Sequence, residues 1–291
     1  MGFDTAYEAI AQESGDQRWA FGTGFADPLA GVDTSVPDGV AGADLAAYCL
    51  MIGDDALIMS HRLQEWLARA PELEEETALA NIALDLLGQA RLLLARAGHA
   101  DGSGRDEDDY ALRRSEPEFR NVTLAEVTDA DFGGLIARLL VFSTWRLALL
   151  DRLRSARDPV LAAVAAKGVK EVTYHRDYAA QWLLRLAGGT EYSRGRMVAG
   201  LAAVAPLTAE LFTCTDTERR LIAGQVAAEP ASLRAEFDAV ITNVLDLAGL
   251  AWPDSPALPE AAGRGGAHTE AMGDLLAELQ SVARACPGAT W

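Results

Sequence analysis

Apolar residues recur along this chain with the period of an α-helix, and the alternation typical of β-strands is rare. A first long helix is predicted over about residues 44–70. Its apolar stripe consists of Leu45, Tyr48, Cys49, Ile52, Ala56, Met59, Leu63, Trp66 and Leu67. A turn at Pro71 leads into a second long helix over about residues 72–97, which Gly98 would close. Two long helices joined so tightly must pack antiparallel.

Two more long helices follow in the middle of the chain. Thr123 and Glu126 have the spacing of a capping box ahead of a third helix, over about residues 132–156. Asp158 and Pro159 open a fourth, which extends to about residue 186 and stops before a Gly-Gly pair. The long helices therefore number four.

The remaining segments give the domain organisation. Residues 1–40, rich in Gly, Asp and Pro, predict a flexible N-terminal extension, and residues 41–291 predict one helical domain. Residues 99–120 form a charged crossover or partner-facing loop, and residues 250–266 form a loop rich in Pro and Gly. Shorter helices are expected at about 193–212, 215–227, 232–249 and 268–286, with a possible capping box at Thr215 and Glu218. The fold class is all-α, a four-helix bundle with additional C-terminal helices.

The net charge and the cysteine positions exclude several classes of function. The net charge is −18, from 43 acidic and 25 basic residues, so the chain would repel phosphate backbones and anionic membranes. Its three cysteines lie far apart and predict neither a disulfide framework nor a zinc site. The most apolar segment, residues 135–150, is interrupted by Arg138 and Arg146 and favours a buried helix over a membrane span. Without a signal peptide at its start, the chain is expected in the cytoplasm.

A narrow polar line follows one face of the second helix. Asn81, Asp85, Gly88 and Gln89 share this face, and both flanks are apolar. Such a line indicates a polar network in the bundle core, or a helix partly buried against another subunit. An ordinary solvent-exposed stripe is an equal alternative.

Helical bundles of the ferritin-like class can hold two iron ions, and this bundle lacks most of the ligands. Two of the four helices in such a site supply Glu-x-x-His, because residues i and i+3 lie side by side. The equivalent window here ends at Gln89 and has Leu86 in place of Glu. The third helix offers Ser143 and Thr144, whose hydroxyl groups are poor iron ligands.

The fourth helix keeps half of a motif. His175 points inward, but its i−3 position is Val172. Glu171 at i−4 could reach the same neighbourhood or pair with Lys167. We favour a core histidine held by a hydrogen bond. One or two of six ligands survive on the four helices, too few for stable iron.

Two acidic residues on the first helix have a similar ambiguity. Asp54 and Asp55 lie at a depth that could face Asp85 and Leu86 across the hairpin, so either could be a surviving ligand. The favoured interpretation is a buried carboxylate held by hydrogen bonds or an ion pair. We therefore assign no catalytic, cofactor-binding or metal-binding residue. The polar remnants of a degenerate di-iron region are Asp54, Asp55, Asp85, Gln89, Glu171 and His175. A less favoured metal site would combine His61 and Glu65 with Glu171 and His175, each pair at i, i+4.

Several long strings resemble one known family. They are Asp54-Asp-Ala-Leu-Ile-Met-Ser-His-Arg-Leu-Gln-Glu-Trp66, the run from Pro71 to Arg91, Phe119-Arg-Asn121, the run from Lys170 to His175, and the run from Trp182 to Thr190. Over about residues 44–250 the chain resembles the PaaC family, the structural subunits of phenylacetyl-CoA 1,2-epoxidase, also called phenylacetate-CoA oxygenase. No family catalytic residue carries over, because the matching positions are Leu86, Gln89, Ser143 and Val172.

The resemblance implies a ferritin-like structural subunit of an aryl-CoA monooxygenase complex. This chain would carry no cofactor and would not itself be catalytic. Its partners would be the catalytic subunit, which holds the di-iron site, a small bridging subunit and a flavin/iron–sulfur reductase. The complex would epoxidise the aromatic ring in aerobic phenylacetate degradation. Two alternatives stay open: a stand-alone di-iron hydroxylase with an atypical ligand set, and a homo-oligomeric helical scaffold.

Overall fold

Every regular element in the described part of the chain is a helix. The computed structural model describes residue 29, residues 31–254, residue 256 and residues 263–287, and no strand occurs among them. The expected all-α class is confirmed. Residues from Asp33 onward form one compact unit. Most of the predicted N-terminal extension lies outside the described residues.

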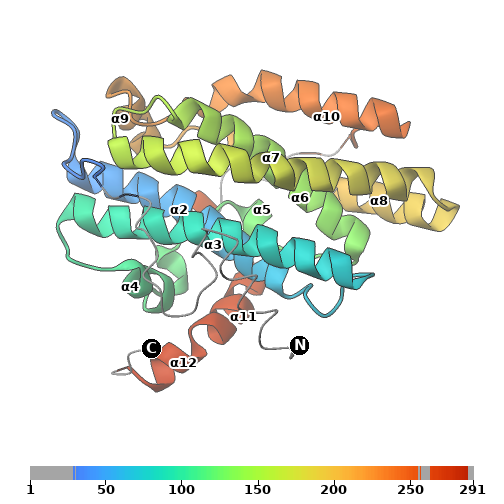
Figure 1. The fold of residues 1–291 in the computed structure, drawn as a ribbon, viewed down its shortest axis with the longest axis horizontal. Helices are drawn as coiled ribbons and strands as arrows, with labels where there is room; N and C mark the ends of the chain where they lie inside the picture. Colours follow the sequence, from blue (N-terminus) through green and yellow to red (C-terminus); the bar gives the residue numbers. More distant parts are fainter. Residues whose placement is uncertain (1–28, 30, 255, 257–262, 288–291) are drawn as a thin grey trace, which may run out of the picture. The chain divides into compact units, whose positions relative to one another are not determined.

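Four long helices form the body of this unit (Figure 1). They are α2 (Gly42–Gln64), α3 (Leu73–Asp101), α6 (Phe132–Leu153) and α7 (Pro159–Gly188). Helices α2 and α3 form one antiparallel hairpin, α6 and α7 form a second, and α3 packs against α7. The core therefore lies between two hairpins.

The start of each helix in the second hairpin is set by an aspartate. Asp131 accepts a hydrogen bond from Gly134 N at 3.0 Å, and Asp158 accepts one from Leu161 N at 2.9 Å. Pro159 occupies the first turn of α7, where its missing N–H costs nothing. These caps fix the depth at which the core residues of α6 and α7 meet.

Helix boundaries differ from the predictions at two places in the first hairpin. Helix α2 ends at Gln64 rather than near residue 70. Helix α3 continues through Gly98 and ends where Gly102 adopts a left-handed φ of 69°. Gly98 serves close packing instead, because a Cβ there would lie 1.9 Å from the carbonyl oxygen of Arg105. A packing glycine inside a helix looks, in sequence, like one that ends it.

The segment between the hairpins is more ordered than expected. It contains α4 (Glu107–Leu112), η2 (Glu116–Glu118) and α5 (Thr123–Glu126). Asp106 caps α4, and Val122, not Thr123, precedes α5. The predicted capping box at Thr123 and Glu126 is therefore wrong, since both residues lie inside α5.

Shorter helices complete the unit. They are α8 (Glu191–Val204), η3 (Ala205–Phe212), α9 (Asp216–Ala223), η4 (Pro230–Leu233), α10 (Arg234–Ala248), η5 (Gly263–Gly265), α11 (Glu270–Leu279) and α12 (Ser281–Ala285). Helix α8 packs on α6, and α10 packs on α6 and α7. The capping box at Thr215 is confirmed, because its hydroxyl accepts from Glu218 N at 3.2 Å and Glu218 accepts from Thr215 N at 2.8 Å.

Three helical stretches in the described chain have the length and apolar composition of a membrane span. They are Leu73–Asp101, Phe132–Leu153 and Glu191–Phe212. The most apolar window of α6 is almost wholly buried inside the protein, so its hydropathy belongs to the core. Less than half of the corresponding window of α3 is buried. Helix α3 thus presents an unusually apolar surface.

Candidate functional site

The polar line of α3 divides between solvent and core. Asn81 is exposed and the Asp85 side chain is 40% exposed, whereas Gln89 is buried. The two interpretations of this line therefore apply to different residues. Asn81 belongs to a solvent-exposed stripe, and Gln89 belongs to a polar network in the core.

Gln89 lies at the centre of that network. Its carbonyl oxygen accepts from Arg146 Nε at 3.0 Å, and its amide nitrogen donates to Glu171 Oε2 at 2.9 Å. Because a guanidinium only donates and a carboxylate only accepts, this orientation of the Gln89 amide is required. Gly168 makes room for it, since a Cβ at Gly168 would lie 3.2 Å from Gln89 Cδ.

Arg146 supplies the positive charge of the network. Its side chain is fully buried on α6, and Nη1 donates to the Ile52 carbonyl of α2 at 3.2 Å. Burial lowers the pKa of Arg146 to about 10, and the charges of Asp55 and Glu171 oppose this shift. The guanidinium is therefore still charged at neutral pH.

The two candidate ligands on α7, His175 and Glu171, are both bound to other side chains of this protein. His175 is buried, and its Nε2 lies 3.0 Å from Asp85 Oδ2 of α3. Glu171, besides its bond to Gln89, forms an ion pair with Lys167 at 2.9 Å. The favoured interpretation of His175 as a hydrogen-bonded core histidine is confirmed.

Asp54 and Asp55 are both fully buried and both paired with arginine. Asp54 accepts from Arg114 and, at 2.9 Å, from the backbone N–H of Arg120. Asp55 accepts from Arg264 at 3.0 and 2.8 Å and from Val122 N at 2.8 Å. Burial raises the pKa of Asp55, and its contacts with Arg264 and Val122 oppose the rise.

The expected meeting of these carboxylates with Asp85 across the hairpin is wrong. Asp85 instead contacts His175 of α7. Asp54 and Asp55 face the connecting segments that cover α2, because Arg120 and Val122 lie before α5 and Arg264 lies in η5. They anchor loops to the bundle.

A second buried charge cluster lies beside Asp55, where α5 meets the C-terminal segment. Glu126 accepts from Asn121 Nδ2 at 2.8 Å and from Thr269 N at 2.6 Å, and it contacts His268 Nδ1 at 2.7 Å. His268 Nε2 lies 3.2 Å from the carbonyl oxygen of Phe119. Both partners of the ring accept hydrogen bonds, an arrangement that favours the protonated imidazole, in which both ring nitrogens donate. Although burial lowers the pKa of His268, the Glu126 carboxylate raises it above its ordinary value.

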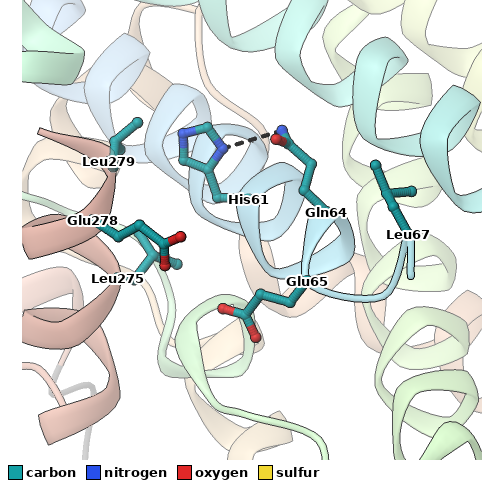
Figure 2. Close-up of a pocket in the computed structure, with 7 residues that line it drawn as sticks. All are labelled: His61, Gln64, Glu65, Leu67, Leu275, Glu278 and Leu279. Atoms are coloured by element: carbon teal, nitrogen blue, oxygen red, sulfur yellow. Dashed lines mark hydrogen bonds between the residues drawn. The ribbon is translucent and has the colours of Figure 1, made fainter. Parts of the chain in front are cut away.

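The less favoured metal site is not assembled. His61 and Glu65 border a pocket of about 370 Å³ between the end of α2 and α11, together with Leu275, Glu278 and Leu279 (Figure 2). His61 Nδ1 is 3.2 Å from Gln64 Nε2, and Glu65 pairs with Arg62. Glu171 and His175 engage other partners, as described above. Burial lowers the pKa of His61 to about 4, so its ring is neutral at neutral pH.

Comparison with known proteins agrees with this architecture. Residues 33–291 match the family described as phenylacetic acid catabolic protein. The chain belongs to this family. Among curated proteins it is 42% identical to the C subunit of 1,2-phenylacetyl-CoA epoxidase from Escherichia coli strain K12, over 247 residues. The match covers 85% of this chain and 99% of the relative. The resemblance drawn from the sequence strings is confirmed, and so is the ferritin-like helical class.

Within this ferritin-like family, the centre of the present bundle does not fit a di-iron pair. Gln89 there joins a carboxylate, Glu171, to a guanidinium, Arg146. A guanidinium has no lone pair for a metal, and its charge repels one. Ser143 bonds to the Leu139 carbonyl at 2.6 Å. Among the described residues, the one cluster with ligand spacing is Glu72, Glu74 and Glu75, at the start of α3 and away from this centre.

Sequence reasoning missed the arginines that organise the site in this family member. Arg114, Arg146 and Arg264 each contact a candidate residue from another element. Arg114 and Arg264 lie 60 and 209 positions from their aspartates, and nothing in the sequence reports such a contact. The sequence does give a signal for Arg146, because Arg146 and Arg138 are the two charged residues that interrupt the otherwise apolar segment 135–150. Buried charges need a partner, so each should have prompted a search for one.

Proposed function

We propose that this chain is the non-catalytic structural subunit of a 1,2-phenylacetyl-CoA epoxidase, acting in aerobic phenylacetate degradation. The observation that carries the proposal is the match to the Escherichia coli epoxidase subunit, which extends over 99% of that relative at 42% identity. A match of that extent leaves almost no part of the relative without a counterpart here. The chain would work in the cytoplasm as one component of the monooxygenase complex.

The chemistry of the bundle centre supports a non-catalytic role. The side chains that could have held iron are engaged by Arg114, Arg264, Lys167 and other groups of the same chain. We propose that this chain carries no cofactor and that the di-iron site belongs to the partner catalytic subunit. That subunit would also hold the aryl-CoA thioester. A small bridging subunit and a flavin/iron–sulfur reductase would complete the complex.

The surface of α3 and α7 supports a role in assembly. Leu84 and Tyr174 are 62% and 77% exposed. They directly precede Asp85 and His175, which contact each other, so they lie at the same depth of the bundle. Large exposed apolar side chains on adjacent helices indicate a protein interface. The catalytic subunit would cover this face with an obligate interface of more than roughly 2,000 Å² in total.

Co-expression with the catalytic subunit tests the proposal. The two chains should elute together from a sizing column at micromolar concentration, and epoxidation of phenylacetyl-CoA should require both. Iron analysis of each separated chain should place about two iron atoms in the partner and close to none in this chain. Separate elution, or activity of the catalytic subunit alone, would contradict the structural role.

The same measurements test the two alternatives. A stand-alone hydroxylase would contain iron and oxidise its substrate without a partner. A homo-oligomeric scaffold would assemble from this chain alone and leave the catalytic subunit unbound. Either result would replace the present proposal.

A further inference from the structure

One buried cation reaches all four long helices of the bundle. Arg146 belongs to α6, donates to the Ile52 carbonyl of α2 and donates to Gln89 of α3. Through Gln89 the network continues to Glu171 of α7. In a ferritin-like di-iron protein, ligands from the four helices converge on the metal in the same way. Here the polar contacts of the four helices meet at Gln89 and Arg146.

The guanidinium lies among charges of both signs, because the carboxylates near it are also paired with Arg264 and Lys167. Asp55 and Glu171 both interact electrostatically with Arg146. Only part of the guanidinium is satisfied, since Nη2 is buried without a hydrogen-bond partner among the described residues. Arg146 is therefore held by charge and by the four-helix network rather than by saturated hydrogen bonding.

We propose that the Arg146 guanidinium is a built-in replacement for the metal cation of the ferritin-like bundle. It adds a positive charge near Asp55 and the partly buried Glu171, and it joins α6 directly to α2 and α3 and, through Gln89, to α7. A bundle of this fold can then keep its four long helices joined at the centre without a metal ion. This inference rests on the fold and on the contacts of Arg146, not on the proposed function, and it is tested on the purified full-length chain alone.

Substitutions of Arg146 separate charge from packing. Arg146→Met keeps much of the volume and removes the charge. It leaves Gln89 and the Ile52 carbonyl without their buried donor, and Glu171 and Asp55 keep only Lys167 and Arg264 as cationic neighbours. Arg146→Lys keeps the charge but loses the planar set of N–H donors of the guanidinium. Thermal unfolding should show Arg146→Met to be the less stable variant, with a midpoint about 5–15 °C below the parent. Arg152→Met is the matched control, because Arg152 lies on the same helix in an exposed ion pair, and its midpoint should hardly change.

The opposite order would overturn the proposal. A buried ion pair can be replaced by an apolar residue without loss where the charge serves no purpose. If Arg146→Met is as stable as Arg146→Lys, or more stable, packing explains Arg146 and the replacement of a metal cation does not.

Small-molecule rescue gives a second readout. Arg146→Ala leaves a space beside Glu171, and about 50 mM guanidinium should raise its midpoint by a few degrees while equimolar urea or NaCl should not. Urea has nearly the same shape as guanidinium but no charge. Equal rescue by urea would show that only the volume matters. If Arg146→Ala does not fold, the relative stabilities of Arg146→Met and Arg146→Lys show whether the charge or the volume of Arg146 matters.

Discussion

At the scale of single residues, the buried aspartates of α2 are held by arginines that arrive from other elements. Asp55 should therefore be sensitive to loss of charge alone. Asp55→Asn keeps the shape of the side chain but leaves Arg264 buried and unpaired, which should cost about 3–5 kcal/mol of unfolding free energy. Chemical denaturation monitored by circular dichroism measures this loss.

Asp44 provides a matched control at the start of the same helix. Its pair with Arg220 is at the surface, where solvent weakens the attraction, so Asp44→Asn should change stability little. Equal losses in the two variants would mean that burial of the Asp55 pair has no special importance.

The residue scale also shows where prediction from sequence stops. The favoured interpretation of Asp54 and Asp55 as buried, ion-paired carboxylates is confirmed. Their partners could not be predicted, because periodicity along a helix describes its own faces only. A core polar network was one of two equal interpretations for Gln89, and its neighbour Arg146 was seen only as an interruption of an apolar helix.

At the scale of elements, the long helices were predictable because each repeats its apolar stripe over many turns. Short elements such as α4 and α5 repeat nothing, and tertiary contacts fix them. The C-terminal helix α11 was expected from its pattern, but its attachment was not. Two buried contacts bind the segment that leads into it: Arg264 with Asp55, and His268 with Glu126.

The attachment of α11 should depend on pH. Glu126 raises the pKa of His268, so the protonated ring contributes stability that is complete below its unfolded pKa of about 6.5. That contribution is lost as the pH rises through the raised pKa of the folded state. Hydrogen exchange in residues 270–279, corrected for its intrinsic pH dependence, should therefore accelerate as the pH rises above about 6.5.

His268→Gln tests the origin of that dependence. The amide can donate one hydrogen bond to Glu126 but does not titrate, so exchange in α11 should become insensitive to pH. Glu116 also faces His268 electrostatically, and Glu116→Gln should alter the dependence only slightly. Unchanged pH dependence in His268→Gln would assign the effect to another group. Thr269 N–H and Asn121 still hold Glu126 at high pH, so α11 should loosen rather than detach.

At the scale of the whole molecule, the exposed face of α3 and α7 connects the fold to assembly. Leu84→Glu and Tyr174→Glu each place a charge where an apolar contact is proposed, and each should weaken binding of the catalytic subunit at least about 30-fold. Both side chains are exposed, so the midpoint of the chain alone should hardly move. Titration calorimetry or sizing of the two-chain complex measures the binding.

The control for this face lies on another helix. Leu247 on α10 is 69% exposed, similar to Leu84, but α10 packs on α6 and α7 and leaves α3 uncovered. Leu247→Glu should therefore bind the catalytic subunit as the parent does. If all three variants bind equally, the partner occupies another surface. If Leu84→Glu and Tyr174→Glu instead dissociate an assembly of this chain with itself, the exposed face forms a homo-oligomer. That result would favour the homo-oligomeric scaffold over the structural subunit of an epoxidase.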